Sequence, residues 1–529
     1  MTTHPTLLLT TDGSARSAAQ NSTRSRWACR APLMVAAGLI FIITAFNLIR
    51  LVTAPAPRNP WEATEVLEAW RSLRGMPVYE LTPAGHSTHV YGALVPWVQG
   101  KIFRLVGPNN VSGRMLSVVS GLALVALLAV TMRGESSAWY LLVAGAVILG
   151  SNNRSEQYFA ENRPDMTALL FGAAGVLLIG LGQERRRWLY VVLGTACLVS
   201  GFFFKQTAFI FGAVPLVALV LRWRRPVRSE MILAAVPLAV SASVILALKI
   251  VNPTVYHYMI FAPKAFGLDW LRAVRCFWDL LIDSPLFLVL FCECIIFDSA
   301  SIDRVPRLRW LFAVFAVAIP FSAITAGKVG GAPNSLLPAL LAMTAFCALR
   351  LPRLFGSLRN LKSPLATRLL AAIFVALLML MSTFPHMTRS RGWIARANPW
   401  DQEYKKAVRL VEMLPGTVIC PEDPTIPLYA KGYAGQNIFS EFDTHLVNGE
   451  WPAVPPATFL ASCQTADYVV EITEYWQKLL TDDLLQSLGF EPAPELAADL
   501  SCYRIWRRKP LEPAPILSRT ALNETDIAH

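Results

Sequence analysis

Charged residues are scarce in this chain. They occupy 16% of its 529 positions, whereas hydrophobic residues occupy 54%, and the mean hydropathy is +0.43. A soluble globular domain carries about 25% charged residues. The composition therefore excludes a soluble fold for most of the chain and indicates a polytopic membrane protein.

Cysteine is also sparse, with nine residues in the whole chain. Four lie inside apolar runs, where cysteine behaves as a small hydrophobic residue: Cys197, Cys292, Cys294 and Cys347. The Cys-x-Cys spacing of Cys292 and Cys294 is too short, and its surroundings are too apolar, to indicate a metal site. Three more fall in the C-terminal region: Cys420, Cys463 and Cys502. An extracytoplasmic location would allow one disulfide among them, but the sequence does not pair them.

The N-terminus lacks the pattern of a cleaved secretory signal, in which charged residues precede an apolar core and a small-residue cleavage site. Residues 1–32 are rich in Thr, Ser and Arg, and we expect them to form a disordered cytoplasmic tail. The first apolar run then serves as an uncleaved signal-anchor. No internal repeat is visible in the sequence.

Long apolar runs, by contrast, are abundant. A helix needs about 20 predominantly apolar residues to cross the hydrocarbon core. Eleven runs approach that length: 33–53, 111–131, 137–152, 166–182, 188–204, 206–221, 231–251, 284–298, 310–326, 333–349 and 369–385. They predict an all-α polytopic membrane domain over residues 33–390 with about eleven transmembrane helices, of which the third and eighth are short.

Basic residues follow a clear topological bias. With the N-terminus inside, the tail and the cytoplasmic connections hold 20 of the 48 lysine and arginine residues, mainly in 184–188, 222–228, 304–309 and 350–368. The short outer connections hold few, as the positive-inside rule requires. The net charge of +12 therefore reflects topology. A nucleic-acid partner is not indicated, because that would need basic and aromatic residues gathered on one soluble face.

Three segments are too polar to span a membrane. The first outer loop, 54–110, contains two helical patterns separated by a Pro/Gly-rich turn, and the second, 252–283, is rich in aromatic residues, which favour the membrane interface. We expect residues 391–510 to form a small extracytoplasmic α/β domain. Its expected strands are 417–421, 467–472 and 502–508, and its expected helices are 401–414 and 473–488. Residues 511–529 are polar and predicted to be disordered.

The first outer loop carries the candidate catalytic acid, Glu62. On a helix that starts near position 61, this residue shares one face with three apolar residues, Val66, Trp70 and Leu73. Glu62 should therefore point towards the protein. Glu65 and Glu68 lie off that stripe, and we expect them to face water. The ordinary explanation for Glu62 is an acid in the first helical turn that interacts with the helix dipole.

This loop resembles the first outer loop of the GT-C superfamily of polytopic glycosyltransferases, such as protein O-mannosyltransferases and aminoarabinose transferases. These families often show an Asp-Glu pair, a helix and a Gly-x-Pro-x-Tyr turn. Glu62 matches the Glu, and Gly75, Pro77 and Tyr79 match the turn, but Trp61 replaces the Asp. Further similar motifs, within residues 33–350, are HVYGAL (89–94), GRMLSVVSG (113–121), ENRPDM (161–166), KQT (205–207) and GKVGGAPNSLLP (327–338).

The resemblance implies an inverting glycosyltransferase that moves a hexose or pentose from a polyprenyl-phosphate donor to a lipid, glycan or protein acceptor. It places the reaction at the outer face of the plasma (inner) membrane. A carboxylate must take the proton of the attacking hydroxyl, and the resemblance implies Glu62 for that role. Cationic groups must hold the donor phosphate as charge develops on it. Some relatives require a divalent metal ion, and the sequence leaves that requirement open.

The other candidate residues lie at the outer ends of the predicted spans, level with Glu62. We expect them to bind the donor phosphate or another part of the substrates: Arg114, Arg163, Asp165, Lys205, Lys328, His89 and Tyr91. Lys205 lies between two apolar runs, where ionisable groups usually face the bundle interior. Lys328 lies in a glycine-rich turn that would allow close backbone approach to a phosphate.

Several of these residues also have an ordinary structural explanation. Arg114 fits an interfacial anchor, Arg163 and Asp165 fit an ion pair at a helix end, and Lys328 fits a flexible turn. A lone loop histidine such as His89 is commonly solvated.

Two other functions compete with sugar transfer. A transporter or flippase of lipid-linked sugars would place ionisable residues near the bilayer midplane and often contains paired broken helices. A non-catalytic scaffold would display the C-terminal domain. The clustering of charges at the outer boundary favours the enzyme over both. Glu293 falls inside the eighth apolar run with no evident partner and no assigned role.

Overall fold

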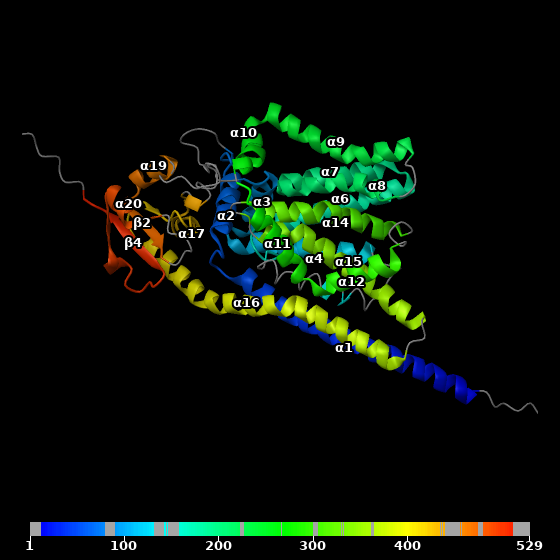
Figure 1. Ribbon diagram of the computed structural model, residues 1–529. Helices are drawn as coiled ribbons and strands as arrows, with labels where there is room; N and C mark the ends of the chain where they lie inside the picture. Colours follow the sequence, from blue (N-terminus) through cyan, green and yellow to red (C-terminus); the bar gives the residue numbers. More distant parts are fainter. Residues whose placement is uncertain are drawn as a thin grey trace, which may run out of the picture.

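The protein consists of a bundle of long helices with a small mixed α/β domain at one end (Figure 1). The computed structural model describes residues 12–79, 90–131, 142–143, 145–146, 158–222, 227–265, 267–299, 305–328, 331, 333–360, 364–433, 435, 437–439, 455, 457–473 and 480–510.

Seven helical segments among the described residues are long and apolar enough to cross a membrane. Four of them are whole helices: α4 (Asn110–Thr131), α6 (Asp165–Arg185), α9 (Arg228–Val251) and α14 (Pro306–Ala326). The other three are Arg30–Thr53 of α1 (Asp12–Thr53), Asn334–Gly356, which contains most of α15 (Leu337–Asn360), and Leu365–Thr383 of α16 (Leu365–Met413). The bent pair α11 (Trp270–Ile282) and α12 (Pro285–Asp298), with an angle of 83°, adds an eighth candidate. Shorter apolar helices are α7 (Trp188–Phe204) and the continuous pair η2 (Gln206–Ala213) and α8 (Val214–Val220).

Every predicted apolar run except 137–152 coincides with helix, and most of that run lies outside the described residues. The helical membrane fold is therefore confirmed, whereas the count of eleven spans is not. Short elements complete the bundle between the long helices: α10 (Pro253–Tyr256), η3 (His257–Phe261), η4 (Ala262–Ala265) and η5 (Pro333–Leu336).

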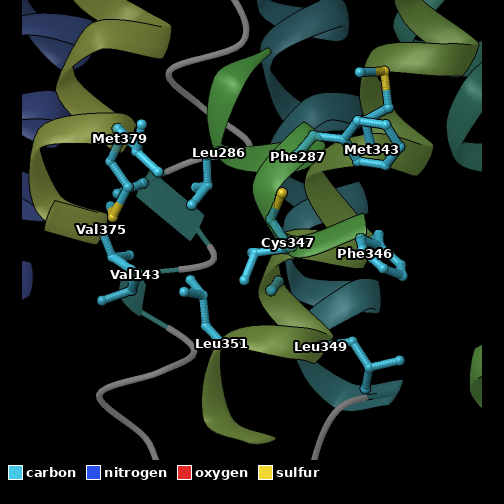
Figure 2. Close-up of a cluster of buried hydrophobic side chains, with 14 of the residues drawn as sticks. Val143, Leu286, Phe287, Met343, Phe346, Cys347, Leu349, Leu351, Val375 and Met379 are labelled. Atoms are coloured by element: carbon cyan, nitrogen blue, oxygen red, sulfur yellow. The ribbon is translucent and has the colours of Figure 1, made fainter. Parts of the chain in front are cut away.

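The centre of the bundle is an apolar core built around α15. Figure 2 shows side chains of α12, α15 and α16 meeting in this core. The fully buried ring of Phe346 lies 5.7 Å from Phe287, 5.8 Å from Phe312 and 5.5 Å from Phe315, as measured between ring centroids. Angled ring contacts at such distances are favourable for aromatic pairs. They fix how α12, α14 and α15 pack.

The outer surface of the bundle is apolar as well. Only 22% of the 18-residue apolar stretch of α9 is buried, and its Ile250 and Val251 are 72% and 82% exposed. Large apolar patches in contact with water would be unfavourable, whereas hydrocarbon accepts them. The chain is therefore an integral membrane protein. On α11, Trp270 and Trp278 are also largely exposed, a position typical of aromatic residues at the interface.

Helices α6 and α7 approach each other unusually closely. A side-chain carbon added to Gly175 would lie 2.9 Å from the carbonyl oxygen of Gly194, and one added to Gly194 would lie 2.7 Å from the carbonyl oxygen of Gly175. Small residues allow this backbone contact between membrane helices. Because α6 begins at Asp165 and α7 ends just before Lys205, the contact fixes these two ionisable residues at the same end of the bundle.

The two helices expected in the first loop are α2 (Pro60–Leu73) and α3 (Leu94–Val106). Asn59 caps α2, since its side chain accepts a hydrogen bond from the Glu62 N–H, and Pro60 occupies the first helical position, where its missing N–H costs nothing. Beyond the helix, Gly75 has φ +72°, a conformation that favours glycine. The chain therefore turns at Gly75, the position at which the sequence predicts a turn.

The long helix α16 runs beside α1 and continues into the C-terminal domain (Figure 1). The domain contains β1 (Val418–Ile419), β2 (Tyr468–Ile472), β3 (Phe490–Pro492), β4 (Tyr503–Arg508), α17 (Thr425–Lys431), α19 (Ala457–Thr465), α20 (Asp482–Ser487) and η6 (Pro494–Leu496). The strand order is β1-β2-β4-β3; β1 and β2 are parallel, and the other two pairings are antiparallel.

The expected α/β architecture and all three expected strands are present in this domain. The helix expected at 473–488 is represented among the described residues by α20. This helix starts only at Asp482, where Thr481 caps it. Residues 474–479 lie outside the described set. The three C-terminal cysteines are buried, and none of them is in a disulfide bond among the described residues: Cys420, Cys463 and Cys502.

Two expectations differ from the structure. Helix α1 begins at Asp12, inside the tail expected to be disordered, because the Ala- and Arg-containing segment continues the helix of the apolar run. Glu293 does have a partner: its Oε2 lies 2.6 Å from an Nη atom of Arg350, which also contacts Asp298 at 2.6 Å. The periodicity of one helix cannot reveal a partner 57 residues away.

The close contact between α6 and α7 can be tested with Gly194→Leu. The added side chain must push the helices apart, and overpacking typically costs about 1 to 3 kcal/mol. We expect a lower midpoint of thermal unfolding for the purified protein. Gly38→Leu is the matched control, since nothing lies within 4 Å of a carbon added to Gly38. Equal midpoints for the two variants would contradict the described packing.

Candidate active site

A fully buried ion pair joins the start of α2 to α4. The Nε and Nη2 atoms of Arg114 donate hydrogen bonds to the two carboxylate oxygens of Glu62, at 2.9 Å and 2.6 Å, and both side chains are 0% exposed. The remaining donors of Arg114 bind the carbonyl oxygens of Leu51, Ala54 and Ala56. All five N–H groups of the guanidinium are therefore engaged.

The carboxylate of Glu62 is equally saturated. Its oxygens also accept hydrogen bonds from the backbone N–H groups of Arg58 and Asn162, both at 2.7 Å. Burial alone would raise the pKa of Glu62, but the charge and hydrogen bonds of Arg114 and the two backbone donors lower it overall. Glu62 faces the protein, as predicted, and its environment favours the anionic form of a carboxylate that has no solvent-exposed oxygen.

A second group of buried charges lies where α6 begins. The Nζ atom of Lys205 lies 2.5 Å from Oδ1 of Asp165, which also accepts a hydrogen bond from the side chain of Asn334 at 3.2 Å. The ammonium of Lys205 also lies 5.0 Å from the ring centroid of Tyr91, within the range of a cation–π contact. Three segments distant in the sequence thus converge on one carboxylate.

Arg163 links the two groups. Its guanidinium lies over the rings of Trp61 and Tyr158, 5.1 Å and 5.4 Å from their centroids, and its Nε lies 3.4 Å from a carboxylate oxygen of Glu161. It also approaches the Tyr91 hydroxyl at 3.5 Å and the Asn59 side chain at 3.5 Å. Arg163 is only 6% exposed, so a single cation connects the capped start of α2 with the loop before α6.

The two other glutamates of α2 are also buried, which makes the expectation that they face water wrong. Glu65 is 1% exposed and Glu68 is 0% exposed. Helix α2 packs against α3 and α4 on one side and against α17 of the C-terminal domain on another, so it has no broad water-facing side. Burial raises the pKa of Glu65 to about 8, although the cations of Arg163 and Lys205 act in the opposite direction.

The C-terminal domain contributes directly to holding this loop. Asp401 of α16 forms an ion pair with Arg58 at 3.0 Å and accepts a hydrogen bond from the Ala56 N–H at 3.3 Å. The side chain of Asn437 donates a hydrogen bond to the Pro60 carbonyl oxygen at 2.9 Å. The start of α2 is therefore clamped from the bundle and from the domain.

The structure thus brings together most of the residues selected from the sequence: Glu62, Tyr91, Arg114, Arg163, Asp165 and Lys205. Lys328 makes different contacts: its backbone pairs with Leu268, and its Nζ lies 3.4 Å from the Pro263 carbonyl oxygen. His89 lies outside the described residues.

The sequence reasoning missed three residues at this site. Asn334 lies inside a matched motif and Asn59 just before the expected helix, where an Asn is a recognisable cap; neither was selected. The burial of Glu65 is not visible in the periodicity of α2, because the charged residues that act on it, such as Arg163 and Lys205, lie far along the chain. Among the described residues, no group of three His, Cys, Asp or Glu side chains is arranged to hold a metal ion, so the structure identifies no set of metal ligands.

Comparisons with known proteins support the fold. Residues 92–256 match the family model of dolichyl-phosphate-mannose-protein mannosyltransferases. The crystal structure of ArnT from Cupriavidus metallidurans bound to undecaprenyl phosphate is 13% identical, with a TM-score of 0.51 over 90% of this chain and 99% of that chain. Its apo form is 13% identical, with a TM-score of 0.50 over 90% and 100%. No curated protein sequence matches the chain. The fold is that of the GT-C glycosyltransferases.

The buried pair can be tested with Glu62→Gln. Removing one charge leaves the guanidinium of Arg114 buried without its counter-charge, which typically costs about 3 to 5 kcal/mol. We expect a large fall in the free energy of unfolding in denaturant. The control is Glu230→Gln, which breaks the partly exposed contact of Glu230 with Arg222 at 2.9 Å and should cost about 1 kcal/mol. If both variants were equally stable, the pair would not hold the loop.

Proposed function

We propose that this membrane protein of the GT-C superfamily transfers a sugar from a polyprenyl-phosphate donor to a hydroxyl group of an acceptor at the outer face of the membrane. The family match covers Arg114, Arg163, Asp165 and Lys205. The similar ArnT fold was observed with undecaprenyl phosphate bound to that protein. Both findings support a donor of this chemical class.

The observation that carries the proposal is a pair of cations, the buried Arg163 and the half-buried Lys205, at one end of the spanning helices. Breaking the bond between sugar and phosphate leaves negative charge on the phosphate, and cations in a water-poor site stabilise that charge strongly. Lys205 follows directly on α7, and Arg163 immediately precedes α6. A donor whose lipid tail stays in the bilayer could present its phosphate at this level.

The roles of the two carboxylates around these cations differ. Asp165 is engaged by Lys205 and Asn334, so we propose that it orients the ammonium towards the substrate. The sequence analysis proposed Glu62 as the general base. Its four hydrogen-bond donors and complete burial instead favour a positioning role, in which Glu62 fixes the first turn of α2. Direct displacement by an acceptor hydroxyl would invert the configuration at the anomeric carbon.

The distribution of basic residues indicates on which side of the membrane the site lies. The positive-inside bias places the basic connections in the cytoplasm, so the α2 end of the bundle and the C-terminal domain would face outwards. We propose that the protein resides in the plasma (inner) membrane. The acceptor class, whether lipid, glycan or protein, is left to the assay.

The proposal can be tested by incubating the purified protein with undecaprenyl-phosphate hexoses and pentoses and measuring sugar transfer or hydrolysis. Lys205→Gln keeps a hydrogen-bond donor near Asp165 but removes the charge. We expect kcat/KM to fall about a hundredfold or more, as for the loss of a group that stabilises transition-state charge.

Lys101→Gln is the matched control, because Lys101 is an exposed lysine of α3 that lies over Trp97. Equal activity of the two variants would remove Lys205 from the mechanism. Movement of the donor lipid across vesicles without any transfer would favour a flippase instead.

A further inference from the structure

Glu65 is a buried carboxylate that the proposed mechanism has not used. It lies on α2, is 1% exposed, and its Oε2 atom is buried without a hydrogen-bond partner among the described residues. An unsatisfied buried polar atom is costly and calls for an explanation. A role of Glu65 in receiving a proton from a bound substrate would provide that explanation.

The surroundings of Glu65 are those of the charged site itself. Two cations, Arg163 and Lys205, stabilise its anionic form, while the charges of Glu68 and Asp165 oppose it. The half-buried phenols of Tyr79 and Tyr91 also interact with its charge. Glu65 therefore shares the electrostatic surroundings of the proposed phosphate-binding cations.

The position of Glu65 in the helix also places it on the side of α2 that meets Arg163. Trp61, one turn earlier on the same helix, lies beneath the Arg163 guanidinium. Residues four apart lie on the same face of a helix, one turn from each other. Glu65 therefore projects from the face that carries Trp61, which directs a carboxylate towards the same cluster.

We infer that Glu65, and not Glu62, takes the proton of the acceptor hydroxyl during sugar transfer; the inference rests on the function proposed above. The other carboxylates nearby are less suited to the role. Glu62 is saturated by four donors. Asp165 and Glu161 each have, like Glu65, one buried oxygen without a hydrogen-bond partner, but Asp165 forms an ion pair with Lys205 and Glu161 forms one with Arg163. Glu65 forms no ion pair among the described residues. A general base needs a lone pair that is available to the substrate.

The step balances in atoms and charge. A lone pair of the acceptor oxygen forms the new bond to the anomeric carbon, while the bond from that carbon to the donor phosphate oxygen breaks and its electron pair leaves on the phosphate. The hydroxyl proton moves to the Glu65 carboxylate. The phosphodiester monoanion becomes a polyprenyl-phosphate dianion, and neutralisation of Glu65 offsets the extra charge. Arg163 and Lys205 stabilise the dianion.

The pH dependence follows from the burial of Glu65. Its raised pKa, about 8, means that the carboxyl is mostly protonated at neutral pH in the free protein. Only the deprotonated form can accept a proton, so the transfer rate should rise as the pH increases through about 8. The neighbouring cations, Arg163 and Lys205, favour the anionic form of Glu65, whereas the charges of Glu68 and Asp165 oppose it.

The decisive experiment compares Glu65→Gln with Glu68→Gln in the full-length protein, using undecaprenyl-phosphate hexoses and pentoses as donors. Glu68 is a buried glutamate on the same helix that lies 3.8 Å from Arg71. We expect Glu65→Gln to lower kcat about a hundredfold to ten-thousandfold, the range for general-base catalysis, with little change in KM for the donor. Its residual rate should lose the pH-dependent rise. Glu68→Gln should keep that rise, displaced to lower pH because the charge of Glu68 opposes the anionic form of Glu65.

Further variants make each outcome decisive. If Glu65→Gln does not fold, Glu65→Asp keeps a carboxylate, and the inference requires it to keep a pH-dependent rate with a displaced midpoint. Wild-type transfer together with equal kcat values and pH profiles for the Glu65 and Glu68 variants would overturn the inference alone. A wild-type protein that transfers no sugar from any of these donors would overturn the proposed function, and the inference with it.

Discussion

The buried ion pair between Glu62 and Arg114 is the interaction on which the arrangement of the site depends. Two opposite charges can be buried only when their hydrogen-bonding groups are satisfied. Here that requirement draws in carbonyl groups from the end of α1 and the following linker, together with the backbone N–H of Asn162. The first turn of α2, the linker before it and the loop before α6 therefore form one unit with α4.

The C-terminal domain belongs to the same unit. Helix α16 carries the chain from the far end of the bundle to this domain without a break, and its Asp401 binds Arg58 on the linker. Leu428 of α17 joins the apolar cluster formed by Val66 and Ala69 of α2. The domain thus packs against one side of the helix that carries the candidate acids. It also contributes the charge of Asp401 to the linker before that helix.

The sequence predicted the spanning helices, the sheet and the inward direction of Glu62 because each follows from local patterns: apolar runs, short β-branched runs and helical periodicity. It could not predict the burial of Glu65 and Glu68, because that burial depends on the packing of α2 against α3, α4 and α17, segments that follow it at widely separated places in the chain. The same limit applies to Asn334 beside Asp165 and to Arg350 beside Glu293. Periodicity assigns a side chain to a face of its own helix, whereas tertiary packing decides what covers that face.

Two glutamates three positions apart on one helix thus acquire opposite properties. Glu62 meets a guanidinium and two backbone donors, which lower its pKa, whereas burial raises the pKa of Glu65, which has an oxygen without a donor. A carboxylate with a lowered pKa is suited to holding a loop through its charge, whereas a carboxyl with a raised pKa is suited to exchanging a proton near neutral pH. The ring of Trp61 lies under the Arg163 guanidinium, so the first turn of α2 presents a neutral aromatic face to that cation in place of a further carboxylate.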